Sequence, residues 1–439
     1  MQGERKTLTQ LSVPICLETL FYMLSGMVDT LMLSSVSDQA VGAVGTANTY
    51  IGVFIIMFGV ISSGMVAVMS QNIGAGKPGI AYQARQLGLV FNALTGILMS
   101  FILAAFSGWI LKIVSIAPAL LEPAETYLKI VGGASFLNAL IPIFSSYLRV
   151  FGYTKHSLIG TVVGNVINII LNSVFLFVFH WGVMGVATAT VISKVVNLII
   201  VAAMGAVLIK AKQSPERAQP RRILAQIVKI GFPSAFETAL YNVAMTFIVC
   251  FMNHMDTDGM NVTARSYAMQ IANFSYCVGA ALAQANAIMT GWRIGAKKYE
   301  ECDRGTRKAV IYGLVTATCF SVTFAITGRF IVHIFTNDIQ MIELVVKLLV
   351  VDIFLEFGRV TNLVYGQALK TSGDAIFPVI MGAIFMYLFA VGGTYFLGIH
   401  MGLLAVGAYI AMAGDECARA VGMVIRWKSG KWKSKSLVE

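Results

Sequence analysis

The sequence predicts an all-α integral membrane protein with twelve transmembrane helices, arranged as two six-helix bundles that are related by an internal parallel repeat. Three observations carry this prediction: an apolar composition, regularly recurring apolar segments, and motifs that occur twice. Of the 439 residues, 57% are hydrophobic and only 12% are charged, and the mean hydropathy is +0.77. Ordinary soluble domains do not reach these values.

Apolar segments of roughly 20 residues recur along the chain between short polar breaks, and each is long enough to cross about 30 Å of hydrocarbon. We expect the spans to cover 10–34, 44–73, 86–111, 125–150, 157–179 and 184–209, then 223–253, 262–292, 308–333, 341–369, 376–398 and 402–426. Each half of the chain therefore supplies six helices.

The two halves share motifs at an offset of about 220 residues, which is the signature of an internal repeat. The repeated motifs are Pro14-x-x-x-Glu18-Thr19-x-x-Tyr22 with Pro233-x-x-x-Glu237-Thr238-x-x-Tyr241, Ile73-Gly74-Ala75 with Ile294-Gly295-Ala296, Leu148-Arg149-x-x-Gly152 with Leu369-Lys370-x-x-Gly373, and His180-x-Gly182 with His400-x-Gly402. An even number of spans returns the chain to the same side, so the halves should share one orientation. We expect an N-terminal lobe over 1–210, a cytoplasmic linker over 211–222, a C-terminal lobe over 223–426 and a basic cytoplasmic tail over 427–439.

The net charge is +11, and its lysines and arginines collect in alternate loops. This distribution reflects the orientation of the chain in a membrane and does not indicate a nucleic-acid partner. Cytoplasmic loops carry this excess of basic residues. Both termini should therefore be cytoplasmic, with the chain in a bacterial inner (plasma) membrane. The tail from Arg426 to Lys435 mixes aromatic and basic residues, and we expect it to seat the last helix at the anionic inner leaflet.

Ionisable residues inside the predicted spans are the first candidates for function, because burying a charge in hydrocarbon is costly. In the first half they are Glu18, Asp29 and Lys194, and in the second Glu237, Arg265, Asp352, Glu356, Arg359, Asp415, Glu416 and Arg419. A duplicated apolar half with an acidic residue in its first span is typical of a secondary transporter.

Glu18 and Glu237 each follow a proline by four residues in the first span of their half. A proline leaves one backbone carbonyl without its helical partner, so a bend and a polar pocket can coincide there. Each glutamate could exchange a proton, bind Na⁺, or anchor the bundle by hydrogen bonds. Asp29, one turn before the outer end of its span, could serve transport or cap the helix at the interface.

The tenth span carries Asp352, Glu356 and Arg359 on one face, because their spacings are four and three. Glu356 and Arg359 should pair, in a role that is structural, functional or both, whereas Asp352 has no partner on its own helix. Asp415, Glu416 and Arg419 form a similar cluster that we interpret as structural.

The fifth span presents an amide stripe, since Asn165, Asn168 and Asn172 recur at spacings of three and four. Such a stripe can join helices or line a polar cavity.

These residues resemble the multidrug and toxic compound extrusion (MATE) antiporters over essentially the whole chain. Val28-Asp29-Thr30 is similar to the V-D-T of the family's first helix. Asn168-Ile169-Ile170-Leu171-Asn172 with Gly182-x-x-Gly185-Val186-Ala187 resembles the passage from its helix 5 to helix 6. Ala368-Leu369-x-x-x-Gly373-Asp374 with Pro378 resembles the exit of its helix 10.

The resemblance implies two six-helix bundles around a central cleft and export of organic cations, drugs or other amphipathic compounds, driven by Na⁺ or H⁺. Asp29 would be the acidic coupling residue, with Asn168 as its amide neighbour. Asn172 stands where one branch of the family has aspartate. In the second lobe, the helix 7 glutamate of sodium-coupled members would fall at Tyr241, so Glu237 is a displaced equivalent one turn earlier. The helix 10 aspartate of those members would fall near Gly358, which leaves Glu356 and Asp352 as substitutes.

We therefore expect a cation-coupled antiporter that works by alternating access. It needs no cofactor beyond Na⁺ or H⁺, its candidate Na⁺ positions are Asp29 and Glu237, and a monomer suffices. Its partners are small amphipathic or cationic substrates and the lipid bilayer. One alternative is a flippase for lipid-linked precursors. The other is a membrane-embedded enzyme, and the sequence argues against an enzyme because it contains no HExxH, paired-aspartate or Ser-His-Asp candidates.

Overall fold

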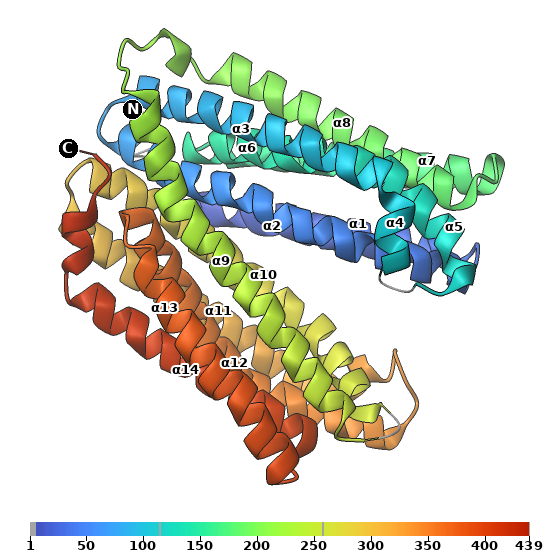
Figure 1. Cartoon of the computed structure of the whole chain (residues 1–439). Helices are drawn as coiled ribbons and strands as arrows, with labels where there is room; N and C mark the ends of the chain where they lie inside the picture. Colours follow the sequence, from blue (N-terminus) through green and yellow to red (C-terminus); the bar gives the residue numbers. More distant parts are fainter. Residues whose placement is uncertain (1–5, 114–115, 257–258, 439) are drawn as a thin grey trace. The chain divides into compact units, whose positions relative to one another are not determined.

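A computed structural model of the chain describes residues 6–113, 116–256 and 259–438, which form helices joined by short turns (Figure 1). The first half contains α1 (Leu8–Ser34), α2 (Asp38–Gly74), α3 (Pro78–Ala105), α4 (Ser107–Ile113), α5 (Pro118–Tyr127), α6 (Phe136–Val150), α7 (Thr154–Ser173) and α8 (Gly182–Leu208). Within it, α5 continues through a π-helical turn at Leu128–Gly132, and α7 through another at Val174–Val178.

The second half contains α9 (Pro220–Asn253), α10 (Met260–Gly295), α11 (Tyr299–Val332), α12 (Ile339–Ser372), α13 (Ile376–Phe385) and α14 (Leu404–Lys428). Two π-helical stretches, Met386–Val391 and Thr394–His400, extend α13. Short 3₁₀ turns lie before α9 at Ala211–Gln213 and after α14 at Lys431–Lys435.

The two halves repeat the same order of helices. The equivalents of α1, α2 and α3 are α9, α10 and α11, which begin about 220 residues later. α5 with α6 corresponds to α12, α7 to α13 with its extensions, and α8 to α14. The turn after the fourth span of each half needs a glycine, since Gly152 has φ +83° and Gly373 has φ +101°, a conformation that other residues rarely adopt. This requirement explains why both motifs that contain Arg149 and Lys370 end in glycine.

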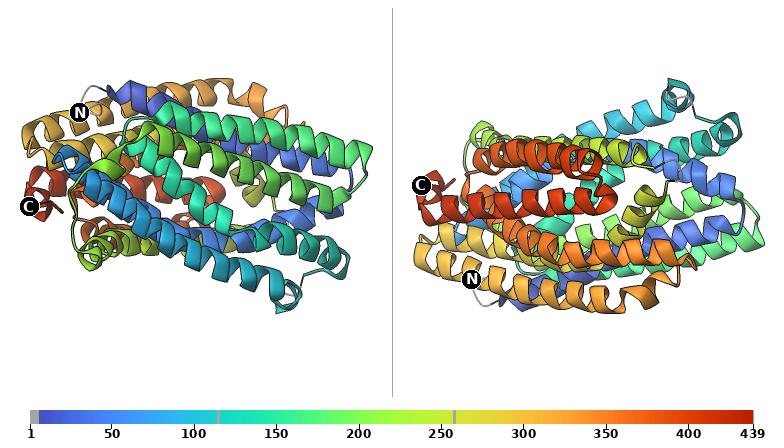
Figure 2. Two further views of the ribbon diagram at one scale, coloured as in Figure 1. Left: turned by 90° about the horizontal axis from the view of Figure 1, so that it is seen from above. Right: turned by 90° about the horizontal axis from the view of Figure 1, so that it is seen from below.

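The chain forms two compact units, one of which contains Val13–Phe232 and the other Leu8–Ser12 with Pro233–Glu439. In the first unit, α7 and α8 lie side by side along their lengths (Figure 2). In the second, α12 packs against α10, α11 and α14. α9 is a continuous helix through Pro233, so it already begins inside the segment 211–222 that was expected to be a linker.

The outward surfaces of both units are apolar, as a bilayer requires. Examples are Leu94 on α3 and Phe330 on α11, whose side chains are 66% and 78% exposed. Among the described residues, eight single helices are long and apolar enough to cross a membrane, and α5–α6 forms a ninth span that is bent by 42°. The remaining spans, α10, α12 and α14, carry the buried charged residues of the second unit.

The two tryptophans of the tail are buried in the second unit, while lysines of the tail remain exposed. Trp432 is only 1% exposed and stacks on Trp427 with ring centroids 4.2 Å apart. Asp374, in the turn after α12, pairs with Arg426 and Lys435 at 2.7 and 3.2 Å. The tail is therefore packed into the second unit, because its tryptophans find apolar partners there.

Candidate functional site

The first unit brings Asp29 together with the amide stripe of α7. Asn172 Nδ2 donates a hydrogen bond of 2.6 Å to Asp29 Oδ1, and Asn172 Nδ2 also lies 3.3 Å from Asn168 Oδ1. Asn168 and Asn172 are 3% and 0% exposed. The stripe faces α1, because Asn165 Nδ2 also donates to the carbonyl of Phe21 at 2.7 Å.

Two further side chains complete this first-lobe site, which we define as Asp29, Tyr127, Asn168, Asn172 and Lys194. Lys194 on α8 interacts electrostatically with the Asp29 carboxylate. Tyr127 on α5 also interacts electrostatically with Asp29. The site thus draws on four spans of one lobe. Its carboxylate accepts a hydrogen bond from an amide while a lysine ammonium lies nearby, an arrangement that can exchange a small cation or proton for another positive charge.

Glu18 lies in a different environment on the same helix. Arg149 Nη2, near the end of α6, is 2.7 Å from Glu18 Oε1, and Ser157 Oγ donates to the same oxygen at 3.0 Å. The glutamate is 7% exposed. Glu18 therefore connects α1 to α6 by an internal ion pair and to α7 by a hydrogen bond.

Glu237 occupies the equivalent place in the second lobe. Lys370 Nζ, near the end of α12, is 2.6 Å from Glu237 Oε2. The repeat thus preserves an ion pair between the first and fourth spans of each lobe. Sequence reasoning singled out both glutamates and missed both partners, although Arg149 and Lys370 stood at equivalent positions of a repeated motif.

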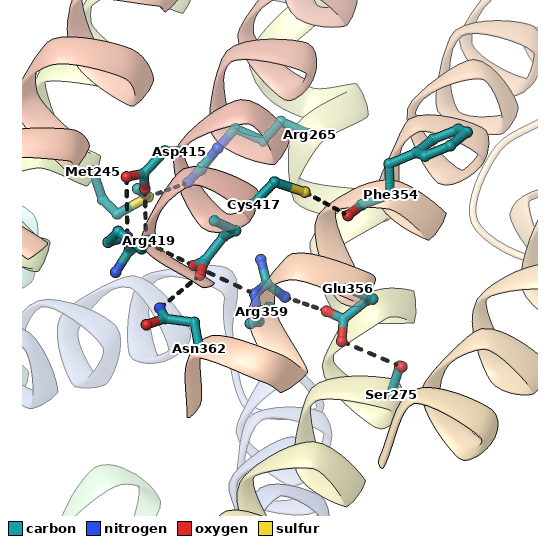
Figure 3. Close-up of polar contacts among 11 residues, drawn as sticks. Met245, Arg265, Ser275, Phe354, Glu356, Arg359, Asn362, Asp415, Cys417 and Arg419 are labelled. Carbon is teal, nitrogen blue, oxygen red and sulfur yellow. Dashed lines mark hydrogen bonds and ion pairs between the residues drawn. The ribbon is translucent and has the colours of Figure 1, made fainter. Parts of the chain in front are cut away.

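The second lobe contains a buried polar network between α10, α12 and α14 (Figure 3). Arg359 Nη1 pairs with Glu356 Oε1, as the spacing predicted, and Ser275 Oγ on α10 donates to Glu356 Oε2 at 3.4 Å. Arg419 forms a two-pronged pair with Asp415 at 3.0 and 2.6 Å.

Glu416 joins the two predicted clusters into one network. Its Oε1 lies 2.8 Å from Arg419 Nη2 and 3.9 Å from Arg359 Nε, and Asn362 Nδ2 donates to Oε2 at 2.9 Å. Spacing along a helix cannot reveal this connection, because Glu416 and Asn362 come from different spans.

The remaining predicted residues of the second lobe are not part of this network. Asp352 is 3% exposed, and in the described part of the chain it forms no ion pair within 4.0 Å. Tyr241, one turn after Glu237 on α9, is 38% exposed and lies within electrostatic range of Arg359.

Comparison with known proteins agrees with this architecture. The MatE family model matches residues 14–174 and, a second time, residues 233–396, which are the two halves of the repeat. A transporter of Bacillus subtilis (strain 168) named YisQ, described as uncharacterized, is 32% identical over 437 residues, which cover 98% of this chain and 96% of YisQ. A probable multidrug resistance protein NorM of Thermotoga maritima is 25% identical over 445 residues, with 99% and 94% covered.

A crystal structure of a MATE protein in a straight conformation superposes with a TM-score of 0.89 at 19% identity, covering 97% of this chain and 96% of the other. The fold prediction of twelve spans in two six-helix bundles is confirmed. The double match of the family model and the full-length likeness to YisQ together show that this chain belongs to the MATE family of membrane transporters.

Proposed function

We propose that this transporter is a cation-coupled antiporter that exports organic cations, drugs or other amphipathic compounds by alternating access. The observation that supports the proposal most strongly is the first-lobe site, where Asp29 is held by Asn172 inside the bundle. The relative from Thermotoga maritima, named as a probable multidrug resistance protein, supports the substrate class.

Exchange follows from competition for one carboxylate. Asp29 can hold either the driving ion, Na⁺ or H⁺, or the positive charge of a substrate, so the arrival of one favours release of the other. We place the coupling cation at Asp29 and not at Glu237, because Lys370 already neutralises Glu237. Asp352 is the corresponding acidic group of the second lobe.

The flippase alternative is not favoured. A pyrophosphate-linked lipid needs a cluster of free cations, whereas Arg359 and Arg419 in the second lobe are neutralised by Glu356, Asp415 and Glu416. We further propose that a single chain is sufficient, with both termini in the cytoplasm of a bacterial cell.

The proposal is tested with purified protein in liposomes that are loaded with a fluorescent organic cation. A Na⁺ gradient and a pH gradient are imposed separately, and efflux is followed by fluorescence. Acceleration by only one gradient would establish antiport and identify the ion. Efflux that responds to neither gradient, with the membrane potential held at zero, would overturn the proposal.

A further inference from the structure

Arg265 on α10 differs from the other buried arginines of the second lobe. It is 7% exposed, and among the described residues its guanidinium makes one side-chain hydrogen bond, from Nη2 to the Sδ atom of Met245 at 3.7 Å (Figure 3). Its buried Nε has no hydrogen-bond partner in the part of the chain that the structure describes. A thioether sulfur is a weak acceptor, whereas a guanidinium carries five N–H donors, so most of the donor capacity of Arg265 is unused.

The carboxylates that could neutralise Arg265 already have other partners. Glu356 pairs with Arg359, and Asp415 and Glu416 pair with Arg419. Within the described residues, Arg265 lies within 4.0 Å of no carboxylate. It is therefore a buried cation whose counter-ion is not supplied by the lobe in this conformation.

Asp352 on α12 is the acidic complement of Arg265. It is 3% exposed and forms no ion pair within 4.0 Å in the described chain, although it interacts electrostatically with Arg359 at longer range. α10 packs against α12, and Tyr409 on α14, which is 2% exposed, interacts electrostatically with both Arg265 and Asp352. Within the described residues, Arg265 has no ion pair and Asp352 has only a longer-range interaction with Arg359, and the two do not pair with each other although both interact with the same tyrosine.

Buried charges are normally paired, since an isolated one is strongly destabilising. Two opposite charges that are left apart match a ligand with one negative and one positive group. A guanidinium recognises a carboxylate with two parallel hydrogen bonds, and displacing the weak Met245 contact would free it to do so. An inorganic anion alone would leave Asp352 with only its longer-range interaction with Arg359.

We propose that Arg265 is the anion-binding group of a substrate subsite in the second lobe, and that it binds the carboxylate of zwitterionic substrates whose positive charge is held at Asp352. The inference rests on the proposed export of cationic or amphipathic compounds and extends it to substrates that carry both charges.

The test uses two dyes that differ only at the proposed contact. Tetramethylrhodamine carries a free carboxylate and is zwitterionic, whereas its methyl ester is a cation with the same fluorophore. Binding of each dye to purified protein in detergent is measured by fluorescence anisotropy. For Arg265→Gln we expect the Kd of the free acid to rise roughly tenfold or more, as for loss of a charge-assisted pair, with the Kd of the ester changed less than about twofold.

Three companion variants sharpen the comparison. Arg265→Lys should retain part of the preference for the free acid, because it keeps the positive charge and loses the two parallel hydrogen bonds of the guanidinium. Asp352→Asn should weaken binding of both dyes. Arg329→Gln on α11, which removes an exposed arginine, should change neither.

Equal weakening of both dyes by Arg265→Gln would show a structural role and overturn the proposal, as would unchanged binding of the free acid. Replacing chloride with gluconate in the binding buffer tests whether Arg265 holds an inorganic anion. If the ester binds the wild type more tightly in chloride, and Arg265→Gln removes this difference, the group holds an inorganic anion and the proposal fails. These measurements need no ion gradient, so failure of the antiport proposal in liposomes would be seen separately.

Discussion

At the scale of single residues, partners decide which intramembrane charges are free to take part in transport. Glu18 and Glu237 are each bound to a basic residue of their own lobe. Asp29 has an amide donor on one oxygen and a lysine at longer range, and Asp352 has no ion pair in the described chain. The acidic residues that the sequence singled out therefore separate into those that are paired with a basic residue and those that are not in an ion pair among the described residues.

Asp29→Asn should abolish ion-coupled efflux while the protein remains in the membrane, because the amide cannot bind a proton or Na⁺ in the same way. The measurement is gradient-driven efflux from liposomes, with Tm in detergent as a check of folding. Glu122→Gln, at an exposed carboxylate in the first turns of α5, is the matched control and should transport normally. Full coupled activity in Asp29→Asn would remove Asp29 from the mechanism.

Glu356→Gln should destabilise the second lobe, because it removes the close ion-pair partner of Arg359 and leaves it the more distant Glu416 and Asp352. Removing one partner of a buried ion pair typically costs about 3–5 kcal/mol, and the residual contact with Glu416 at 3.9 Å should reduce this cost. Adding Arg359→Gln should recover part of the loss. The Tm of each variant in detergent measures both effects. A double variant whose Tm is no higher than that of Glu356→Gln would contradict the pairing.

At the scale of helices, the repeat preserves a specific contact and not only a pattern of hydrophobicity. The first span of each lobe carries a proline and, one turn later, a glutamate that pairs with a basic residue near the end of the fourth span. The glycine that ends this fourth span adopts positive φ in both halves. Proline, ion pair and glycine thus fix the start of one helix against the end of another.

A double-mutant cycle on Glu18 and Arg149 should give a larger coupling energy than the same cycle on Glu237 and Lys370. The side chains of Glu18 and Arg149 are 9% and 19% exposed, and Glu18 also accepts a hydrogen bond from Ser157, whereas Glu237 is 21% exposed and its partner is a flexible lysine. Interaction energies of this kind span about 0.5–3 kcal/mol. They are measured from Tm shifts of single and double Gln variants, and a larger coupling for the second pair would refute the ranking.

At the scale of the whole molecule, the basic loops and the repeat predict the same membrane topology, with both termini on one side. An even number of spans in each half predicts that residues before α1, the segment between α8 and α9, and the residues after α14 lie on one side. The basic residues concentrate in the loops on that side.

Green fluorescent protein fused after the last residue should fluoresce, because both termini are expected in the cytoplasm. Alkaline phosphatase fused at the same place should be inactive. Alkaline phosphatase fused after His180, between α7 and α8, should be active and serves as the opposite control. Activity of the terminal phosphatase fusion would reverse the topology.

The sequence by itself determined the fold class, the number of spans, the repeat and the pairs that lie within one helix. These properties depend on composition, segment length and spacings of three or four residues, which are local quantities. Glu356 with Arg359, and Asp415 with Arg419, were predicted correctly for this reason.

Only the tertiary structure decided which residues from different helices meet. It paired Glu18 with Arg149, placed Asn172 on Asp29, joined Glu416 to Arg359, and left Arg265 with a thioether. It also buried Trp432 of the basic tail. Such contacts depend on the rotation and packing of whole helices, and residues on different helices leave no periodic trace in one sequence.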